Sequence, residues 1–198
     1  MRAAIVFASA LLASGCGSLP APPPDQYFRL NAPPAAAAAS SGVRIQVEHV
    51  EAHGVYAERP LLFRSGGKSG ATQQYRYELW SEPPAKMLRN TLVDHLRSQY
   101  GAERVWTSEA RSPADLTVRG RLRAMEQVMD GASARALLSL EYVVNDAEGN
   151  VIAVFEFNEE IAASSANVND FVAALNQGLA RAYAGLDRRL AQAIAGKP

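Results

Sequence analysis

The sequence predicts an α+β domain in which two main helices pack on one face of a mostly antiparallel or mixed sheet. Three observations predict it. Several short segments alternate apolar and polar residues, as half-buried strands do, and two longer segments repeat apolar residues at helical spacing. A length of 198 residues and a hydrophobic content of 48% suit a single domain with a substantial core.

The first residues have the organisation of a bacterial export signal. Residues 1–15 combine a basic start at Arg2, the apolar run AAIVFASALL and a small-residue exit. That run is too short to span a bilayer, which takes about 20 residues. Cys16 follows, and LASGC resembles a bacterial lipobox, whose thiol receives a diacylglycerol before cleavage. We expect residues 1–15 to be removed and Cys16 to be the lipid attachment site; a plain signal peptide with a stray cysteine is the alternative.

Composition excludes several classes of site. Cys16 is the only cysteine, so neither an internal disulfide nor a structural zinc site can form. As a diacylglyceryl cysteine with palmitate-like chains it would be a stable anchor, because each buried methylene contributes about 0.8 kcal/mol. Lys and Arg number 20, as do Asp and Glu, so nucleic acid is not an expected partner. In the lipobox signals that this segment resembles, aspartate at the position of Gly17 often marks inner-membrane retention, so the resemblance implies the outer membrane, facing the periplasm.

A linker follows the cysteine. Residues 16–42 hold six of the eleven prolines and a pentaalanine run. A proline-rich chain extends about 3.1 Å per residue, so residues 17–26 could hold a domain roughly 30 Å from the membrane. Within the linker, YFRL (27–30) is a short β-type segment that either adds an edge strand or forms a loosely packed aromatic pair. Residues 43–196 are expected to form the single folded domain.

Three short strands open this domain. VRIQVEHV (43–50) and QYRYELW (74–80) alternate apolar with polar residues. PLLFRS (60–65) is predicted to be an edge strand, because Pro60 cannot donate a hydrogen bond to a neighbouring strand. Unpaired edges invite the addition of another chain, so Leu62 and, in the YFRL segment, Tyr27 are candidate partner-binding residues.

The first helix is expected to begin at the Ser81–Pro84 segment, where proline suits the first turn. Gly101 supplies its end, and a short strand at 104–107 follows. The apolar residues recur every four positions: Leu88, Leu92, Leu96 and Tyr100.

Residues 115–162 predict a three-stranded meander with turns at Asp130-Gly131 and DAEGN (146–150). The inward residues are Leu116, Val118, Gly120 and Leu122, then Leu138, Leu140, Tyr142 and Val144, then Phe155 and Phe157. The outward residues include Thr117, Arg119, Arg121 and Arg123, with Glu141, Glu156 and Glu160 on the neighbouring strands. We expect this arginine row to be ion-paired, with an anionic lipid headgroup as the alternative ligand.

A long helix is predicted over 169–195. Its apolar stripe consists of Phe171, Leu175, Leu179, Ala182, Leu186 and Leu190. Gly178 and Gly185 lie beside the stripe. Glycine weakens a helix, so close packing against the sheet is the expected reason for both.

The sequence predicts no catalytic residue, metal or cofactor. His49 and His53 have zinc-ligand spacing but lie at a strand end, where a helix would be required. His95 lies beside the first helix's apolar stripe, with Asp94 as its only expected carboxylate neighbour. There is no G-x-S-x-G motif, so a hydrolase has little support.

The order of the segments carries a resemblance. The lipobox, the proline-rich spacer with YFRL, and VRIQVEHV, YAERPLLFR and YRYELWSEPPAKMLRNTLVDHLRS resemble the ABC-type transport auxiliary lipoprotein family, the PqiC-like group. Residues 56–96 are the most specific part, and ADLTVRGRLRAME (114–126) matches more loosely. The resemblance covers nearly all of the chain after Cys16.

The resemblance implies a role in transport without catalysis. The expected partners are an MCE-domain (MlaD-like) periplasmic protein with its ABC permease and ATPase, which move phospholipids or other hydrophobic molecules between membranes. The lipoprotein would be the outer-membrane docking component, alone or as a homo-oligomer. The alternative is a periplasmic carrier that holds lipid in its own cavity.

Overall fold

A computed structural model describes residues 21–33, 42–66, 70–131 and 133–196. Cys16 and the predicted signal peptide lie outside the described residues. Within these ranges, no helix combines the length and apolarity needed to cross a membrane. The strands are β1 (Gln26–Phe28), β2 (Ile45–Ala52), β3 (Pro60–Ser65), β4 (Thr72–Trp80), β5 (Val105–Thr107), β6 (Leu116–Asp130), β7 (Ser133–Asp146) and β8 (Val151–Ala162). The α-helices are α1 (Pro84–Tyr100) and α2 (Val168–Ala195), and the short 3-10 helices are η1 (Gly54–Ala57), η3 (Ala102–Arg104) and η4 (Ser108–Ala110).

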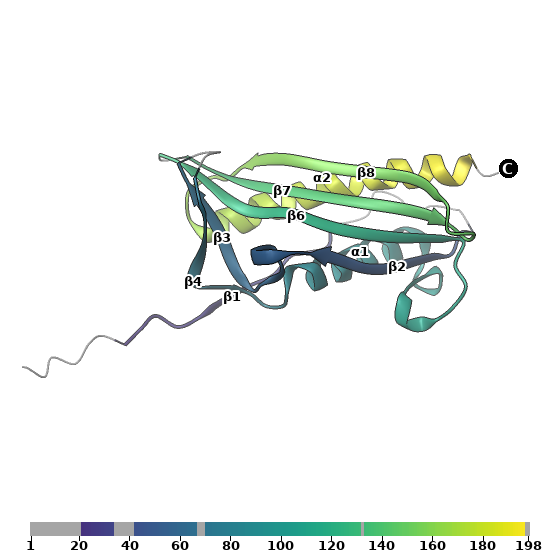
Figure 1. Cartoon of the computed structure of the whole chain (residues 1–198), viewed down its shortest axis with the longest axis horizontal. Helices are drawn as coiled ribbons and strands as arrows, with labels where there is room; N and C mark the ends of the chain where they lie inside the picture. Colours follow the sequence, from purple (N-terminus) through teal and green to yellow (C-terminus); the bar gives the residue numbers. More distant parts are fainter. Residues whose placement is uncertain (1–20, 34–41, 67–69, 132, 197–198) are drawn as a thin grey trace, which may run out of the picture.

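The eight described strands form one mixed sheet organised around β6 (Figure 1). One side of β6 pairs along its length with β7, which pairs with β8, and both pairings are antiparallel. The other side is shared: β2 runs parallel to the first half of β6, and β3 runs parallel to its end. Beyond β2 lies β5, and beyond β3 lie β4 and then β1. The predicted α+β class with a mixed sheet is confirmed.

The meander follows its predicted alternation until a bulge interrupts it. Leu116, Val118 and Leu122 are buried, and the arginines between them point to the other face. The pairing of β6 with β7 shifts between Leu122 and Ala124. Beyond that shift four successive residues, 125–128, are buried, because the bulge bends the strand and side chains of β3 and β4 contact Glu126 and Gln127. Glu126 and Gln127 therefore enter the interior.

Both helices cover the same face of the sheet, and their apolar stripes form the core. The predicted stripe residues of α1 and α2 are all buried. α1 lies against β2 and α2 against β7 and β8 (Figure 1). The helices also meet each other: the Tyr183 hydroxyl lies 2.9 Å from Thr91 Oγ1 and donates to the Leu88 carbonyl at 3.1 Å. Asn167 caps α2 by accepting from the Asp170 amide.

The two glycines of α2 pack as predicted. A Cβ built on Gly178 would lie 2.6 Å from Ile161 Cδ1, and one on Gly185 would lie 2.4 Å from Phe155 Cζ. Both distances are far below van der Waals contact. The glycines therefore let the helix backbone approach β8 closely enough to bury Ile161 and half of Phe155, which offsets their cost in helix propensity.

Candidate docking surfaces

The first candidate surface is β1, the edge strand that contains Tyr27. β1 pairs parallel with β4, with Phe28 opposite Trp80, and no described strand lies on its other side. The first two residues of the YFRL segment thus belong to an edge strand, which is one of the two alternatives that the sequence left open. Tyr27 is 57% exposed, and the Arg59 guanidinium lies 5.3 Å from its ring centroid. Tyr27 therefore presents an aromatic face to solvent beside a cation.

Residues after β1 fasten the linker to the domain. Leu30 is buried, and the Asn31 amide donates to Asn176 Oδ1 of α2 at 3.0 Å. The Pro33 carbonyl oxygen lies 3.2 Å from His95 Nδ1 of α1. The segment is thereby held against both helices, so the chain leaves the domain from a fixed position beside β1 (Figure 1).

The prediction that residues 60–65 form an edge strand is wrong. β3 pairs antiparallel with β4 and parallel with β6, so it has a neighbour on each side. Pro60 is tolerated because the pairing with β6 begins only at Phe63. Leu62 is 3% exposed and lies inside the protein. The reason for selecting Leu62 as a partner-binding residue is therefore removed, since it offers neither a free edge nor a surface.

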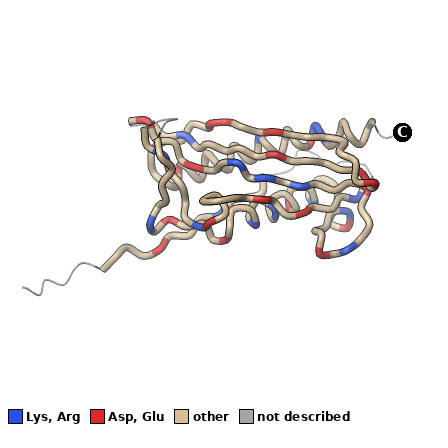
Figure 2. Tube along the Cα trace, viewed as in Figure 1, with Lys and Arg blue, Asp and Glu red and all other residues tan. Residues whose placement is uncertain are grey.

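The second candidate surface is the face of the sheet that the helices leave open, where charges of both signs follow the strands (Figure 2). Arg121 Nη2 lies 3.2 Å from Glu51, and Arg119 Nε lies 3.9 Å from Glu48. Arg123 pairs with Glu141, and lies 3.1 Å from Glu156 of β8. The expected ion-paired row is confirmed, although β2 supplies two of its carboxylates and Glu160 pairs with Arg135 instead.

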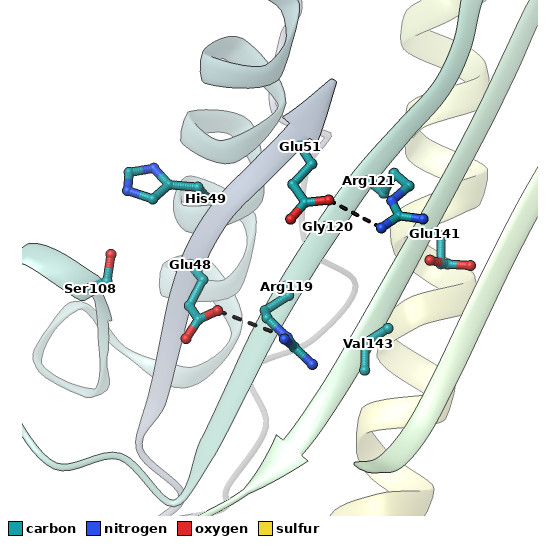
Figure 3. A pocket seen from close by; sticks show the side chains of 9 residues that line it. All are labelled: Glu48, His49, Glu51, Ser108, Arg119, Gly120, Arg121, Glu141 and Val143. Carbon is teal, nitrogen blue, oxygen red and sulfur yellow. Dashed lines mark hydrogen bonds and ion pairs between the residues drawn. The ribbon is translucent and has the colours of Figure 1, made fainter. Parts of the chain in front are cut away.

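A shallow hollow of about 480 Å³ lies on this face (Figure 3). Glu48 and Glu51 project from β2 toward Arg119 and Arg121, and His49 lies on the far side of β2. Each arginine in the hollow already faces a carboxylate, so little cationic charge is left for an anionic ligand. His49 and His53 are exposed, and the described residues contain no cluster of three potential metal-ligating side chains.

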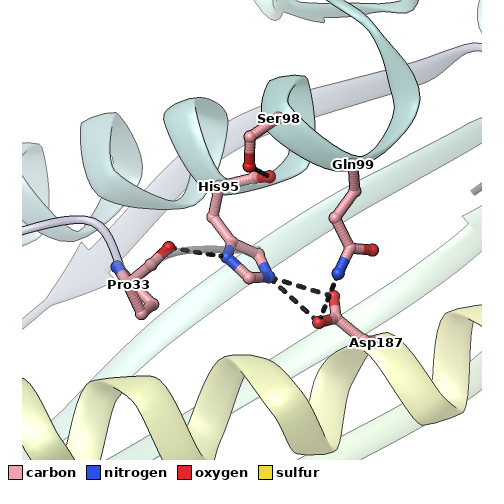
Figure 4. A network of polar contacts seen from close by, with 5 residues as sticks. All are labelled: Pro33, His95, Ser98, Gln99 and Asp187. Atoms are coloured by element: carbon pink, nitrogen blue, oxygen red, sulfur yellow. Dashed lines mark hydrogen bonds and ion pairs between the residues drawn. The ribbon is translucent and has the colours of Figure 1, made fainter. Parts of the chain in front are cut away.

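A buried polar network joins the helices, and the sequence did not reveal it. His95 is 3% exposed, and its Nε2 lies 3.0 Å from Asp187 Oδ2 of α2 (Figure 4). Gln99 donates to the same carboxylate at 2.8 Å. Asp187, not Asp94, is thus the carboxylate partner, and the prediction on this point is wrong. The one signal in the sequence was the position of Asp187, an acidic residue that directly follows Leu186 of the apolar stripe of the last helix.

The geometry favours the doubly protonated form of His95. Both of its ring nitrogens face groups that only accept hydrogen bonds, the Pro33 carbonyl and the Asp187 carboxylate. Burial lowers the pKa of His95, but the hydrogen bond to Asp187, its charge and the Pro33 carbonyl together outweigh burial and raise the pKa above 6.5. The network ties α1, α2 and the linker together and serves the fold rather than catalysis.

A second buried carboxylate lies where β3, β4 and β6 meet. Glu126 accepts hydrogen bonds from Arg64 at 2.5 Å and from Thr72 Oγ1 at 2.9 Å. Next to it the Tyr75 hydroxyl donates to Gln127, whose amide donates to the Ala166 carbonyl at 2.9 Å. Both polar side chains are satisfied within the protein, so this cluster also belongs to the fold.

Comparison with known proteins identifies the family. A model of the ABC-type transport auxiliary lipoprotein component family matches residues 28–186. The chain belongs to this family. The auxiliary lipoprotein family is defined by a role in transport and is not a known enzyme family, and its name places its members in the cell envelope. No protein among the curated sequences matches.

Two crystal structures share the fold of this auxiliary lipoprotein. One is a Xanthomonas campestris protein of family DUF330, with a TM-score of 0.68 and 17% identity over 84% of this chain and 97% of that chain. The other is an uncharacterised protein with a TM-score of 0.67 and 22% identity over 85% of this chain and 99% of its own.

Proposed function

We propose that this chain is the lipid-anchored docking component of an MCE/ABC transporter that moves phospholipids or other hydrophobic molecules between membranes. Cys16 would carry the anchor in the outer membrane, and the domain would reach into the periplasm. The observation that carries the proposal is the family match over residues 28–186, which describes a transport auxiliary lipoprotein.

The packing of the domain supports docking over lipid carriage. A carrier would need an apolar cavity between the sheet and its helices. In this chain that layer is filled by one continuous cluster of buried side chains. Even the space beside the two glycines of α2 is occupied, by Ile161 and Phe155. The buried clusters around His95 and Glu126 are internally paired, which gives no support to a catalytic role.

Binding to the proposed cognate MCE-domain protein tests the proposal. We expect the full-length lipoprotein in detergent micelles to bind that protein at micromolar concentration. Tyr27 is a proposed contact, so Tyr27→Asp should weaken binding without changing the melting temperature, because the side chain is exposed. Arg76→Asp is a matched control, as Arg76 is exposed on β4. If the lipoprotein and the MCE-domain protein are both folded and do not bind each other, the proposed docking function is wrong.

The anchor and the carrier alternative have their own tests. Cys16→Ser should abolish acylation and leave uncleaved precursor, because the thiol is the acceptor. Processing at Gly15 and retention in carbonate-washed membranes would contradict the lipobox. Lipid extracted from purified Cys16→Ser protein should be substoichiometric; one bound lipid per chain would instead support a carrier.

A further inference from the structure

The outer edge of β8 divides into two halves of different chemistry. β8 pairs with β7 on one side, and no described strand pairs with its other side. The second half carries charges that are held by ion pairs, Glu159 with Arg181 and Glu160 with Arg135. Charged side chains of this kind protect an edge from unwanted pairing. The first half has no charge before Glu156, and it exposes three large apolar side chains: Val151 (57%), Ile152 (36%) and Val154 (48%).

A groove runs beside the apolar half, between β8 and the C-terminal half of α2. It consists of two adjoining hollows of about 620 Å³ each, which share Val154, Arg189 and Gln192. Ile152 lines one hollow, and Gly185 lines the other, where the missing side chain leaves α2 close to Phe155. One wall of the groove is thus the free edge of β8, which is apolar except for Glu156 and, at the preceding turn, Asp146. The opposite wall is a polar helix face.

The helix wall is cationic and lacks counter-ions. Arg188 and Arg189 are both exposed, and no ion pair joins either of them to a carboxylate of the described residues. The arginines of the open face behave differently, since Arg119, Arg121 and Arg123 each face a carboxylate. The two carboxylates that line the groove are engaged elsewhere, since Glu156 pairs with Arg123 and Asp146 accepts hydrogen bonds from Asn150. The charge of Arg188 and Arg189 is therefore one that an acidic ligand would complement.

The groove lies at the end of the molecule opposite β1. Figure 1 shows the N-terminal segment leaving beside β1 and the C-terminal end of α2 at the other end. A chain tethered through its N-terminal linker would hold this far end away from the membrane. The position suits a periplasmic protein partner more than a lipid surface.

We propose that the edge of β8 from Val151 to Phe155 is a strand-addition site for an extended partner segment in which apolar and acidic residues alternate. The partner's backbone pairs with the free edge, its apolar residues cover Val154 and its neighbours, and its carboxylates reach Arg188 and Arg189. A second copy offering the same edge brings the same arginines to the groove, since a two-fold interface is self-complementary. An acidic partner is therefore favoured over self-pairing. This inference rests on the proposed docking function and names its contact site.

Synthetic peptides test the site without the transporter. The probe is a short acetylated peptide in which valine and glutamate alternate, titrated up to millimolar concentration against the full-length protein in micelles. We expect saturable binding with slower amide hydrogen exchange at residues 151–155 and unchanged exchange at residues 26–28. A version N-methylated at alternate residues, which cannot donate to the strand, should bind at least tenfold more weakly.

A charge swap gives the sharpest control. Arg188→Glu combined with Arg189→Glu should weaken the glutamate peptide at least tenfold and create binding of the matching lysine peptide. Arg76→Glu, an exposed arginine on β4, should change neither affinity.

Three results would each overturn the proposal. They are the absence of peptide binding, slower amide exchange at residues outside β8, and peptide affinities that the charge swap does not change. A dimer of the peptide-free protein that Val154→Arg dissociates would assign the edge to a second copy instead. None of these results touches the docking function, because that function is tested with the MCE-domain protein itself.

Discussion

The two faces of the sheet are formed by the same strands, but one face carries buried apolar side chains and the other carries half-exposed charged ones. On the covered face Leu116, Val118 and Tyr142 meet the helices and are almost fully buried. On the open face, the residues between them, such as Arg119 and Arg121, remain about half exposed in ion pairs. Burial of apolar area contributes about 25 cal/mol per Å², whereas an exposed ion pair contributes about 0–1 kcal/mol. Most of the stability therefore comes from the covered face, and the residues of the open face are free to vary.

The largest effect should come from the covered face. Leu92→Ala deletes a fully buried side chain of α1 and should lower the free energy of unfolding by about 2–5 kcal/mol, because the cavity cannot fully collapse. Urea denaturation followed by circular dichroism measures it. A loss near 0.5 kcal/mol would mean that the helix does not pack as described.

The next effect concerns the polar group within that covered face. Asp187→Asn removes the charge that His95 and Gln99 face and should cost about 1.5–3 kcal/mol, the range of hydrogen bonds to charged groups. Because the folded-state pKa of His95 is raised, the pair contributes fully below pH 6.5 and is lost as pH rises through the folded pKa. The difference between wild type and variant should therefore shrink toward alkaline pH. A difference that grows with pH would contradict the assigned protonation state.

A smaller effect should come from the helix–strand contact. Gly185→Ala places a methyl group against the Phe155 ring, which costs about 1–3 kcal/mol by overpacking, while helix propensity returns about 1 kcal/mol. Adding Phe155→Leu should restore part of the loss, since it removes the clashing ring atoms. If the single variant is more stable than wild type, the close approach of α2 to β8 is not as described. Thermal melting of the wild type and of both variants measures these differences in stability.

The smallest effect should come from the open face. Arg121→Ala breaks one exposed pair with Glu51 and should change stability by less than about 1 kcal/mol, with a smaller change at high salt. Measurement in low and high salt separates charge from packing. A loss as large as that of Leu92→Ala would show that the open face is covered in solution and would end the comparison.

The periodicity of apolar residues within single elements was sufficient to predict which side chains are buried in much of this protein. Alternation placed Leu116 to Leu122 and the arginines between them on opposite faces, and helical spacing placed the stripes of both helices. The role of Gly178 and Gly185 could also be predicted from the sequence. A glycine weakens a helix, so its presence beside the apolar stripe indicates close packing there. These features depend on residues close together in the chain, where backbone geometry fixes which side chains share a face.

Features that depend on distant pairing were decided by the tertiary structure. Pro60 indicated an edge, yet β3 lies between β4 and β6, and among the described strands it is β8 that has a long free edge. His95 finds its carboxylate 92 residues away on α2, and Arg188 and Arg189 have no ion-pair partner among the described residues only because of where α2 lies. The physical reason is that a strand's neighbours and a buried charge's partner are chosen by how the whole chain packs. The spacing of residues along the sequence does not specify these contacts.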